Sequence, residues 1–203
     1  MTWTFTEQDL TLIFQALAFA AEKHRHQRRK DHEATPYINH PIDIAELLWR
    51  VGGVRDVPTL VAAILHDTIE DTATKPEEIA ALFGEKVLAL VQEVSDDKSL
   101  PKGVRKQLQI EHAPHISRPA KLIKLADKIH NVCSIGHSPP KDWPARRLAD
   151  YLDWAVSVVD GMRGASADLE CYFDETLAQA RVRLEQGNAN CGVEHANERA
   201  PTD

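Results

Sequence analysis

Apolar residues recur at helical spacing along most of the chain, and strand-like alternation is scarce. Near the N-terminus, Thr6 and Asp9 form a capping-box pattern, and apolar side chains then follow three or four positions apart over residues 10–21. Pro41 fits the first turn of a second helix, which the glycine pair at 52–53 ends. The pattern therefore predicts successive helices from the start of the chain.

The central and C-terminal parts of the chain continue this pattern. A third apolar run covers residues 57–69, Thr74 and Glu77 form a second capping-box pattern, and Gly84 is a predicted helix stop. Further helices are expected at about 101–111, 119–133, 143–163 and 166–186. We therefore predict an all-α fold, a single bundle of about eight to ten helices.

Length and composition fit one globular domain with a substantial core. The chain has 203 residues, of which 43% are hydrophobic and 27% charged, close to the globular average. We expect the domain to fill residues 1–186. Residues 187–203 have almost no apolar periodicity and are expected to form a flexible tail.

The charge and the cysteines narrow the class of protein. A net charge of −7 disfavours non-specific binding to nucleic acid or to an anionic membrane. No apolar run of about 18 residues is present, and the N-terminus lacks a basic segment followed by an apolar one. The three scattered cysteines contain no CxxC pair, which fits a reducing compartment and gives no zinc-finger framework. We expect a cytoplasmic protein with no nucleic-acid or membrane partner, and the oligomeric state stays open.

The strongest chemical signal is the segment His66-Asp67-Thr68-Ile69-Glu70-Asp71 at the end of an apolar run. If the segment is helical, His66 and Glu70 lie one turn apart, as do Asp67 and Asp71, so three carboxylates crowd together. Such crowding is unfavourable unless a cation offsets the repulsion. Carboxylate and imidazole ligands suit a divalent ion of the manganese, iron or zinc type. The alternative is that these acidic residues form an exposed helix end.

Two other residues are candidate ligands of the same ion. His40 precedes Pro41, which biases it away from helical geometry at a helix entrance. Asp127 shares a polar sector of its predicted helix with Lys124 and Asn131. By itself, an aspartate at such a position is more often a salt-bridge partner on a helix surface.

Four ordered segments give the chain a family resemblance: HRHQRRKDHEATPYINHP, AAILHDTIED, SDDKSLPKGVRKQ and KLADKIHN. With the order H…HD…D, they closely resemble the hydrolase domain of RelA/SpoT homologues in the HD phosphohydrolase superfamily, specifically the small hydrolase-only members such as the metazoan SpoT homologue. The resemblance spans residues 8–180 and implies an HD-domain helical bundle.

The resemblance also implies a reaction and a set of site residues. It implies a metal ion, usually Mn²⁺ although others such as Zn²⁺ are possible, held by His40, His66, Asp67 and Asp127. Glu70 and Asp71 are implied to position and deprotonate the attacking water. The implied reaction removes the 3′-pyrophosphate of guanosine tetra- or pentaphosphate (ppGpp or pppGpp), giving GDP or GTP and pyrophosphate.

A strongly anionic substrate requires basic neighbours beside a carboxylate-rich site. Residues that match the nucleotide pocket of the family are Arg29, Lys30, Tyr37, Lys98, Lys102, Asn131, Arg147 and Tyr151. Arg147 and Tyr151 are four apart on a predicted helix and could present a guanidinium to phosphate and an aromatic ring to the nucleoside. The alternative is that the basic segments are solvated helix faces.

Two other functions are compatible with the same motif. One is removal of the 2′-phosphate of NADPH, which has been linked to relatives of the hydrolase-only type. The other is a nucleotide-sensing HD module without turnover, against which the intact Glu70 and Asp71 pair argues.

The remaining histidines and the tryptophans receive structural interpretations. Eight other histidines are interpreted as surface residues or as neighbours of the ligands. They are His24, His26, His32, His112, His115, His130, His137 and His195. Trp49, Trp143 and Trp154 fall on apolar helical faces and are interpreted as core residues.

Overall fold

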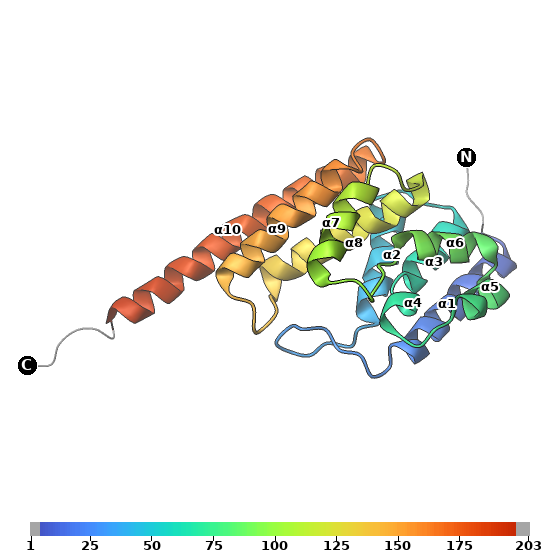
Figure 1. The fold of residues 1–203 in the computed structure, drawn as a ribbon, viewed down its shortest axis with the longest axis horizontal. Helices are drawn as coiled ribbons and strands as arrows, with labels where there is room; N and C mark the ends of the chain where they lie inside the picture. The colour runs from blue at the N-terminus through green and yellow to red at the C-terminus, as the bar shows by residue number, and fades with distance from the viewer. Residues whose placement is uncertain (1–4, 198–203) are drawn as a thin grey trace, which may run out of the picture.

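Helices make up the regular structure of the protein in a computed structural model that describes residues 5–197, with side chains described for residues 5–186 (Figure 1). Within these residues no β-strand forms, and one isolated bridge joins Arg28 and Pro36. The helices are α1 (Glu7–Lys23), α2 (Asn39–Arg50), α3 (Val57–Leu65), α4 (Thr68–Asp71), α5 (Pro76–Phe83), α6 (Glu85–Val94), α7 (Lys102–His112), α8 (Arg118–His137), α9 (Ala145–Asp160) and α10 (Ala167–Asn197). The prediction of an all-α fold is confirmed.

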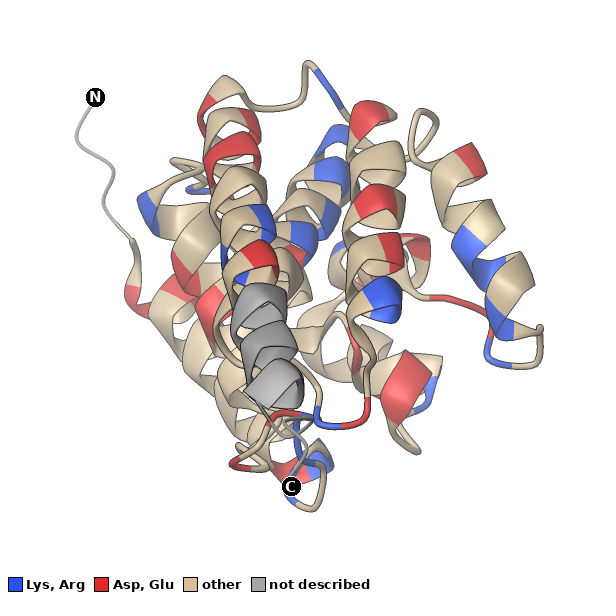
Figure 2. Cartoon of the chain, turned by 90° about the vertical axis from the view of Figure 1, so that its left-hand side faces the viewer, with Lys and Arg blue, Asp and Glu red and all other residues tan. Residues whose placement is uncertain are grey.

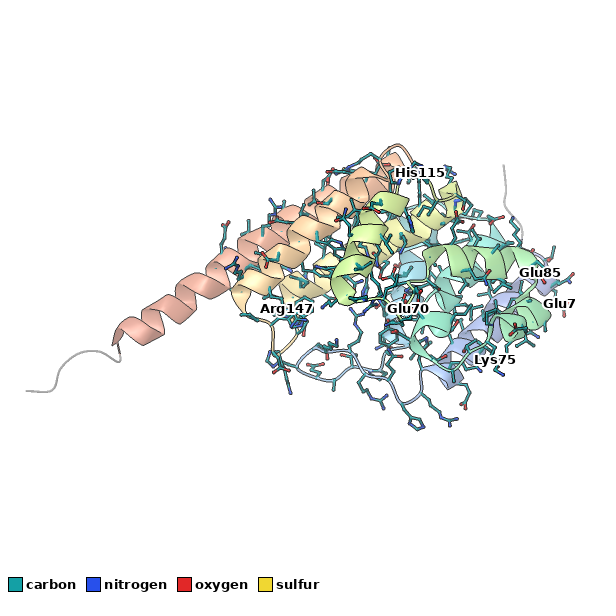
Figure 3. The ribbon with its side chains drawn as sticks, in the orientation of Figure 1. Glu7, Glu70, Lys75, Glu85, His115 and Arg147 are labelled. Atoms are coloured by element: carbon teal, nitrogen blue, oxygen red, sulfur yellow. The ribbon has the colours of Figure 1, made fainter. Side chains whose placement is uncertain are left out.

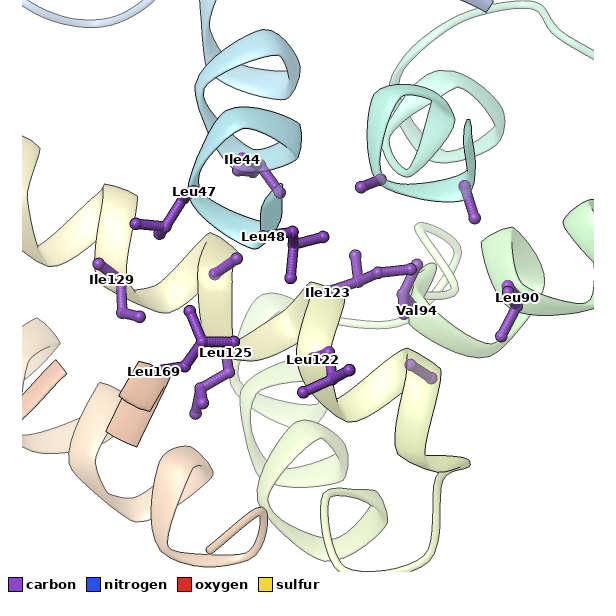
Figure 4. Close-up of a cluster of buried hydrophobic side chains, with 14 of the residues drawn as sticks. Ile44, Leu47, Leu48, Leu90, Val94, Leu122, Ile123, Leu125, Ile129 and Leu169 are labelled. Carbon is purple, nitrogen blue, oxygen red and sulfur yellow. The ribbon is translucent and has the colours of Figure 1, made fainter. Parts of the chain in front are cut away.

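Helix α8 is the centre of the packing. It contacts α2, α3, α6, α9 and α10. Figure 4 shows Ile44 and Leu48 of α2, Ile123 and Leu125 of α8 and Leu169 of α10 meeting in one cluster of buried side chains. Helix α3 is buried from Thr59 through Leu65, so the His66-Asp67 pair follows directly after a helix enclosed by the core. The core therefore fixes the position of the His66-Asp67 pair.

The core position of Leu125 gives a stability prediction. Leu125 is 0% exposed, and truncation to Ala leaves a cavity among α2, α8 and α10. We expect Leu125→Ala to lower the free energy of unfolding by about 2–5 kcal/mol, measured by urea denaturation. The matched control is Leu82→Ala on α5, where the side chain is 55% exposed and the change should stay within about 0.5 kcal/mol. Equal losses in the two variants would contradict the assigned core.

One predicted helix cap is confirmed and the other is wrong. The Thr6 hydroxyl accepts from the Asp9 N–H at 3.1 Å, and the Asp9 carboxylate accepts from the Thr6 N–H at 2.9 Å. At the second site the cap is Lys75, whose N–H donates to Glu78 Oε1 at 2.9 Å, and not Thr74 with Glu77. Pro76 occupies the first helical position, where its missing N–H costs nothing, so the cap lies one residue later.

Two local expectations at the motif are also corrected. The apolar run 57–69 is not one helix, because α3 ends at Leu65 and α4 begins at Thr68. The Thr68 hydroxyl donates to the Leu65 carbonyl at 2.6 Å and replaces a backbone partner at this break. His40 is helical in spite of Pro41, because a proline in the first turn removes an N–H that has no intrahelical partner.

The last helix extends past its predicted end. Helix α10 runs from Ala167 to Asn197, whereas apolar periodicity stops near Gln186. Residues 198–203 of the predicted tail lie outside the described residues, and a flexible tail stays a prediction.

Gly84 separates α5 from α6 at a φ of 86°, as its position in the pattern predicts.

None of the helices within residues 5–197 combines the length and the apolar character needed to span a bilayer.

Candidate active site

Three of the four predicted ligands form a compact cluster between α2 and the break that follows α3. His40, His66 and Asp67 each offer a donor atom, and these atoms all lie within 4.8 Å of one another. Asp67 Oδ2 lies 2.9 Å from His66 Nε2 and 3.7 Å from His40 Nε2. Both imidazoles are buried. The helix break thus points two adjacent side chains toward the same space as His40.

Asp127 of α8 lies beside this cluster. Its Oδ1 atom is 3.2 Å from His40 Nε2 and accepts from Asn131 Nδ2 at 2.6 Å. Lys128, itself buried, donates to Asp127 Oδ2 at 2.9 Å. Asp127 is outside the group whose donor atoms lie within 4.8 Å, so its role as a fourth ligand stays a prediction.

The cluster has the chemistry of a cation site. His66 Nδ1 lies 2.8 Å from the Ala63 carbonyl and must donate to it, which leaves Nε2 directed at the cluster. This Nε2 atom is buried and lies 2.9 Å from Asp67 Oδ2, without the alignment of a hydrogen bond. Burial lowers the pKa of His66, but the Asp67 carboxylate outweighs burial and raises it to about 9. A divalent ion can supply the positive charge in place of a proton, and a set of imidazole and carboxylate donors suits Mn²⁺, Fe²⁺ or Zn²⁺.

Glu70 and Asp71 face basic residues beside the cluster, and Figure 3 shows Glu70 at the centre of the molecule. Glu70 Oε2 accepts from the backbone N–H of Asp96 at 2.9 Å, and its Oε1 lies 3.1 Å from Lys98 Nζ and 3.7 Å from Arg105 Nη1. Asp71 accepts from Lys98 at 2.6 Å and from Gln27 Nε2 at 3.0 Å. Burial raises the pKa of Glu70, and the hydrogen bond from the Asp96 N–H opposes this shift. Neither carboxylate belongs to the ligand group, and their role in positioning the attacking water stays a prediction.

A cavity of about 480 Å³ lies beside residues that contact the cluster, and none of the four candidate ligands lines it. It reaches the ligands through Tyr37, whose hydroxyl donates to Asp67 Oδ2, and through Asn131, which donates to Asp127. Arg29 donates to Asn131 Oδ1 at 3.1 Å and thereby joins this wall. The predicted pocket residues that line the cavity are Arg29, Lys30, Tyr37, Lys98, Asn131 and Tyr151.

A second cavity of about 290 Å³ contains the other two predicted residues, Lys102 and Arg147. Trp143 and Tyr151 line both cavities, so the two are neighbours. Burial lowers the pKa of Lys102, and the positive charges of Arg147, Lys30 and Arg105 lower it further. Cations that repel one another in this way bind an anion favourably.

The loop between α1 and α2 closes one side of the larger cavity. It lies beside the segment between α8 and α9 in Figure 1, and the backbone N–H of Lys141 donates to the Lys30 carbonyl at 3.2 Å. Arg147, at the beginning of α9, lies close to this meeting point in Figure 3. Figure 2 shows basic and acidic residues mixed over the helices, so the basic pocket is a local feature in an acidic protein.

Several pocket residues were missed by sequence reasoning. Gln27 holds Asp71, and Arg105 approaches Glu70 from α7. Arg105 lies three residues after Lys102, on the same helix, and this spacing could have identified it. Gln27 offers no such signal, because its partner is 44 residues away.

The interpretation of the tryptophans as core residues is confirmed only in part: Trp143 and Trp154 pack against the core, whereas Trp49 is exposed. Trp143 lines both cavities, Trp154 lines the smaller one, and Trp49 is 38% exposed beneath Arg55. Each ring is amphipathic and covers the core with one face while the other contacts a cation, an arrangement that helical periodicity alone does not reveal.

Among the other histidines with described side chains, some are neighbours of the site and the rest are exposed. His130 contacts His40, and His24 is buried against Gln27, so both are neighbours of the site. Exposed side chains are found at His26, His32, His112, His115 and His137. The side chain of His195 lies outside the described side chains.

Comparison with known proteins identifies the class to which this fold and ligand cluster belong. The HD-domain family model matches residues 16–151, and the chain belongs to the HD-domain family. The guanosine-3′,5′-bis(diphosphate) 3′-pyrophosphohydrolase MESH1 of Xenopus tropicalis is 52% identical over 87% of this chain and 98% of its own length. Human MESH1 is 51% identical over 78% of this chain and 88% of its own length.

Solved structures agree with this assignment. A structure described as a metazoan ortholog of SpoT that hydrolyzes ppGpp has a TM-score of 0.82 and 44% identity, covering 88% of this chain and 98% of that one. The lmo0812 protein of Listeria monocytogenes has a TM-score of 0.60 and 27% identity, covering 73% of this chain and 98% of that one. The similarity therefore extends over nearly the whole of these relatives.

Proposed function

We propose that this protein is a divalent-metal-dependent hydrolase that removes the 3′-pyrophosphate of ppGpp or pppGpp, giving GDP or GTP and pyrophosphate. The observation that carries the proposal is the His40, His66 and Asp67 cluster with its two buried imidazoles, which Tyr37 connects to a cavity lined by cations and aromatic rings. The activity named for relatives that share about half of the residues supports the same reaction.

The proposed metal site consists of His40, His66, Asp67 and Asp127. When bound, Mn²⁺ or a similar ion would lower the pKa of the attacking water and polarise a phosphoryl oxygen. Tyr37 and Asn131 orient the carboxylates of Asp67 and Asp127 through the hydrogen bonds that they donate. Mn²⁺ is our choice within a donor set that also accepts Zn²⁺ or Fe²⁺.

Glu70 and Asp71 hold the attacking water and accept its proton in this proposal. Lys98 contacts both carboxylates and can pass one of its ion pairs to an incoming phosphate. Arg29 and Lys30 bind phosphate oxygens in the larger cavity, and Lys102 and Arg147 bind the second phosphate group in the smaller one. Tyr151 and Trp143 lie between the cavities, where their rings can pack against the nucleoside.

The proposal is tested by incubating the purified protein with ppGpp, pppGpp, NADPH and ordinary nucleotides, each with Mn²⁺, Zn²⁺ or EDTA. We expect pyrophosphate and GDP or GTP from the first two substrates, and loss of both products in EDTA. Release of phosphate from NADPH in preference would favour the alternative phosphatase. Tight ppGpp binding without products under any metal would favour a sensing module and overturn the proposed reaction.

The basic residues at the pocket mouth lead to a kinetic prediction. Lys102 is exposed and should attract the polyphosphate equally in the ground and transition states. We expect Lys102→Ala to raise KM about 2- to 5-fold with little change in kcat, the effect of losing about 0.5–1 kcal/mol. Steady-state kinetics at two salt concentrations measure both effects, since salt should reduce the difference.

The matched control is Lys86→Ala on α6. Lys86 is exposed and pairs with Asp56, so its replacement removes the same charge at a different part of the surface. If Lys86→Ala raised KM as much as Lys102→Ala, the effect would come from net charge, and the assignment of Lys102 to the pocket would be wrong.

A further inference from the structure

The two histidines of the ligand cluster have different support behind their rings. His66 Nδ1 lies 2.8 Å from the backbone carbonyl of Ala63, within its own helical segment. His40 has no such carbonyl, and its Nδ1 instead lies 2.9 Å from Nδ1 of His130. His130 Nε2 in turn lies 3.2 Å from Oδ2 of Asp43. A line of three side chains thus runs from the cluster toward solvent, where the Asp43 side chain is 56% exposed.

Helices α2 and α8 each contribute two residues to this arrangement. His40 and Asp43 are three residues apart on α2, and Asp127 and His130 are three residues apart on α8. Residues at this spacing share a helix face. Each helix therefore supplies one residue of the metal site and one residue of the line behind His40.

With a cation at His40 Nε2 in place of the proton that Asp127 would otherwise attract, the hydrogen bonds of the line fix where each proton lies. A carboxylate only accepts hydrogen bonds, so His130 must donate to Asp43 from Nε2. A neutral His130 protonated at Nε2 has an accepting lone pair at Nδ1, so the proton between the two rings belongs to His40 Nδ1. A neutral His40 protonated at Nδ1 has its lone pair at Nε2, the atom that lies 3.2 Å from Asp127 and 3.7 Å from Asp67.

We propose that Asp43 and His130 act as positioning residues that hold His40 in the tautomer whose Nε2 binds a divalent cation. The inference rests on the metal site of the proposed function. Supporting partners of a metal-bound histidine fix its ring and tautomer, and their loss commonly weakens metal affinity 10- to 100-fold. Here the support comes from a side chain at the surface, so it can be removed without opening the core.

Mn²⁺ affinity measured by calorimetry on the purified full chain is the test. We expect Asp43→Ala to weaken Mn²⁺ binding about 10-fold. Glu46→Ala is the matched control, because Glu46 lies on the same helix, is 53% exposed and pairs with Arg50. Both changes remove one negative charge from an exposed position on α2, so an effect of net charge would appear in both variants. Equal affinities in Asp43→Ala and Glu46→Ala would overturn the proposal.

Two substitutions at His130 separate positioning from packing. His130→Phe keeps a ring but has no acceptor, and should weaken Mn²⁺ binding as Asp43→Ala does. His130→Asn places an amide oxygen near the position of Nδ1 and can accept from His40 without help from Asp43. We expect His130→Asn to keep affinity within about 3-fold of wild type, and Asp43→Ala added to it to have no further effect. A full additional loss in the double variant would overturn the tautomer argument.

Failure of the proposed function gives a different result. If the wild-type protein did not bind Mn²⁺ or Zn²⁺ at all, the metal site itself would be wrong and this inference with it. If wild type bound Mn²⁺ tightly while every Asp43 and His130 variant matched it, only the positioning role would be lost. Melting temperatures in EDTA check that the variants fold, and Asp43→Ala should match wild type because Asp43 is exposed.

Discussion

Replacing His66 with Ala should remove bound Mn²⁺ and lower turnover of ppGpp by roughly 10³-fold or more, because an ion that serves as Lewis acid and activates the water is lost. Of the four candidate ligands, we choose His66 for this test because the contacts of both ring nitrogens are defined. Its buried Nε2 atom faces Asp67 Oδ2 at 2.9 Å without the alignment of a hydrogen bond, and its Nδ1 atom lies 2.8 Å from the Ala63 carbonyl, to which it donates. Metal analysis of the dialysed protein and single-turnover kinetics measure the two losses.

For the same variant we also expect a change in melting temperature, which can be measured without an activity assay. An ion that binds only the folded protein stabilises it by about 2.7 kcal/mol at a concentration 100 times its Kd. Wild type should therefore melt at a lower temperature in EDTA, while His66→Ala should melt at the same temperature with and without Mn²⁺. Should the protein not fold without this imidazole, Asp127→Asn gives the same comparison. Full Mn²⁺ occupancy in both variants would contradict the ligand assignment.

The sequence predicted the helices wherever burial on one face imposes a period. The apolar stripe of α8 includes Leu122, Leu125 and Ile129, and all three are buried. Local caps were predictable only in part, because Thr6 and Asp9 determine their own geometry, whereas Pro76 moves the next cap to Lys75. The break after Leu65 was not predictable from periodicity, since the apolar pattern continues through it to Ile69.

The predicted site residues come together because α2, α8 and the α3–α4 break converge on one another. The motif predicts which side chains carry the chemistry, and the fold shows which residues contact those side chains. The contact between His40 and His130 joins residues 90 apart in the chain, and the contact between Arg29 and Asn131 joins residues 102 apart. Nothing in local spacing encodes such pairs. Residues whose role depends on one distant partner, such as Gln27 and Asp43, therefore became visible only in the structure.

Glu70 and Asp71 should behave differently from the ligands when they are replaced. Glu70→Gln and Asp71→Asn keep the size and the accepting oxygen, so the bond from the Asp96 N–H to residue 70 and the bond from Gln27 to residue 71 can persist. If these carboxylates position and deprotonate the water, turnover should fall by roughly 10²-fold or more while Mn²⁺ and ppGpp remain bound. Turnover across a Mn²⁺ titration, with nucleotide affinity measured directly, tests this expectation.

Excess Mn²⁺ distinguishes a base from a ligand. Loss of a ligand weakens metal binding, so high Mn²⁺ should restore part of the activity, whereas no concentration of metal replaces a missing base. The matched control is Glu77→Gln on α5, an exposed carboxylate that should leave turnover unchanged. Recovery of Glu70→Gln to near wild-type rates at high Mn²⁺ would show that Glu70 binds the ion. Undiminished turnover in both variants would mean that the ion pairs with Lys98 and Arg105 serve the fold, because carboxylates held by cations can orient α4 without touching the substrate.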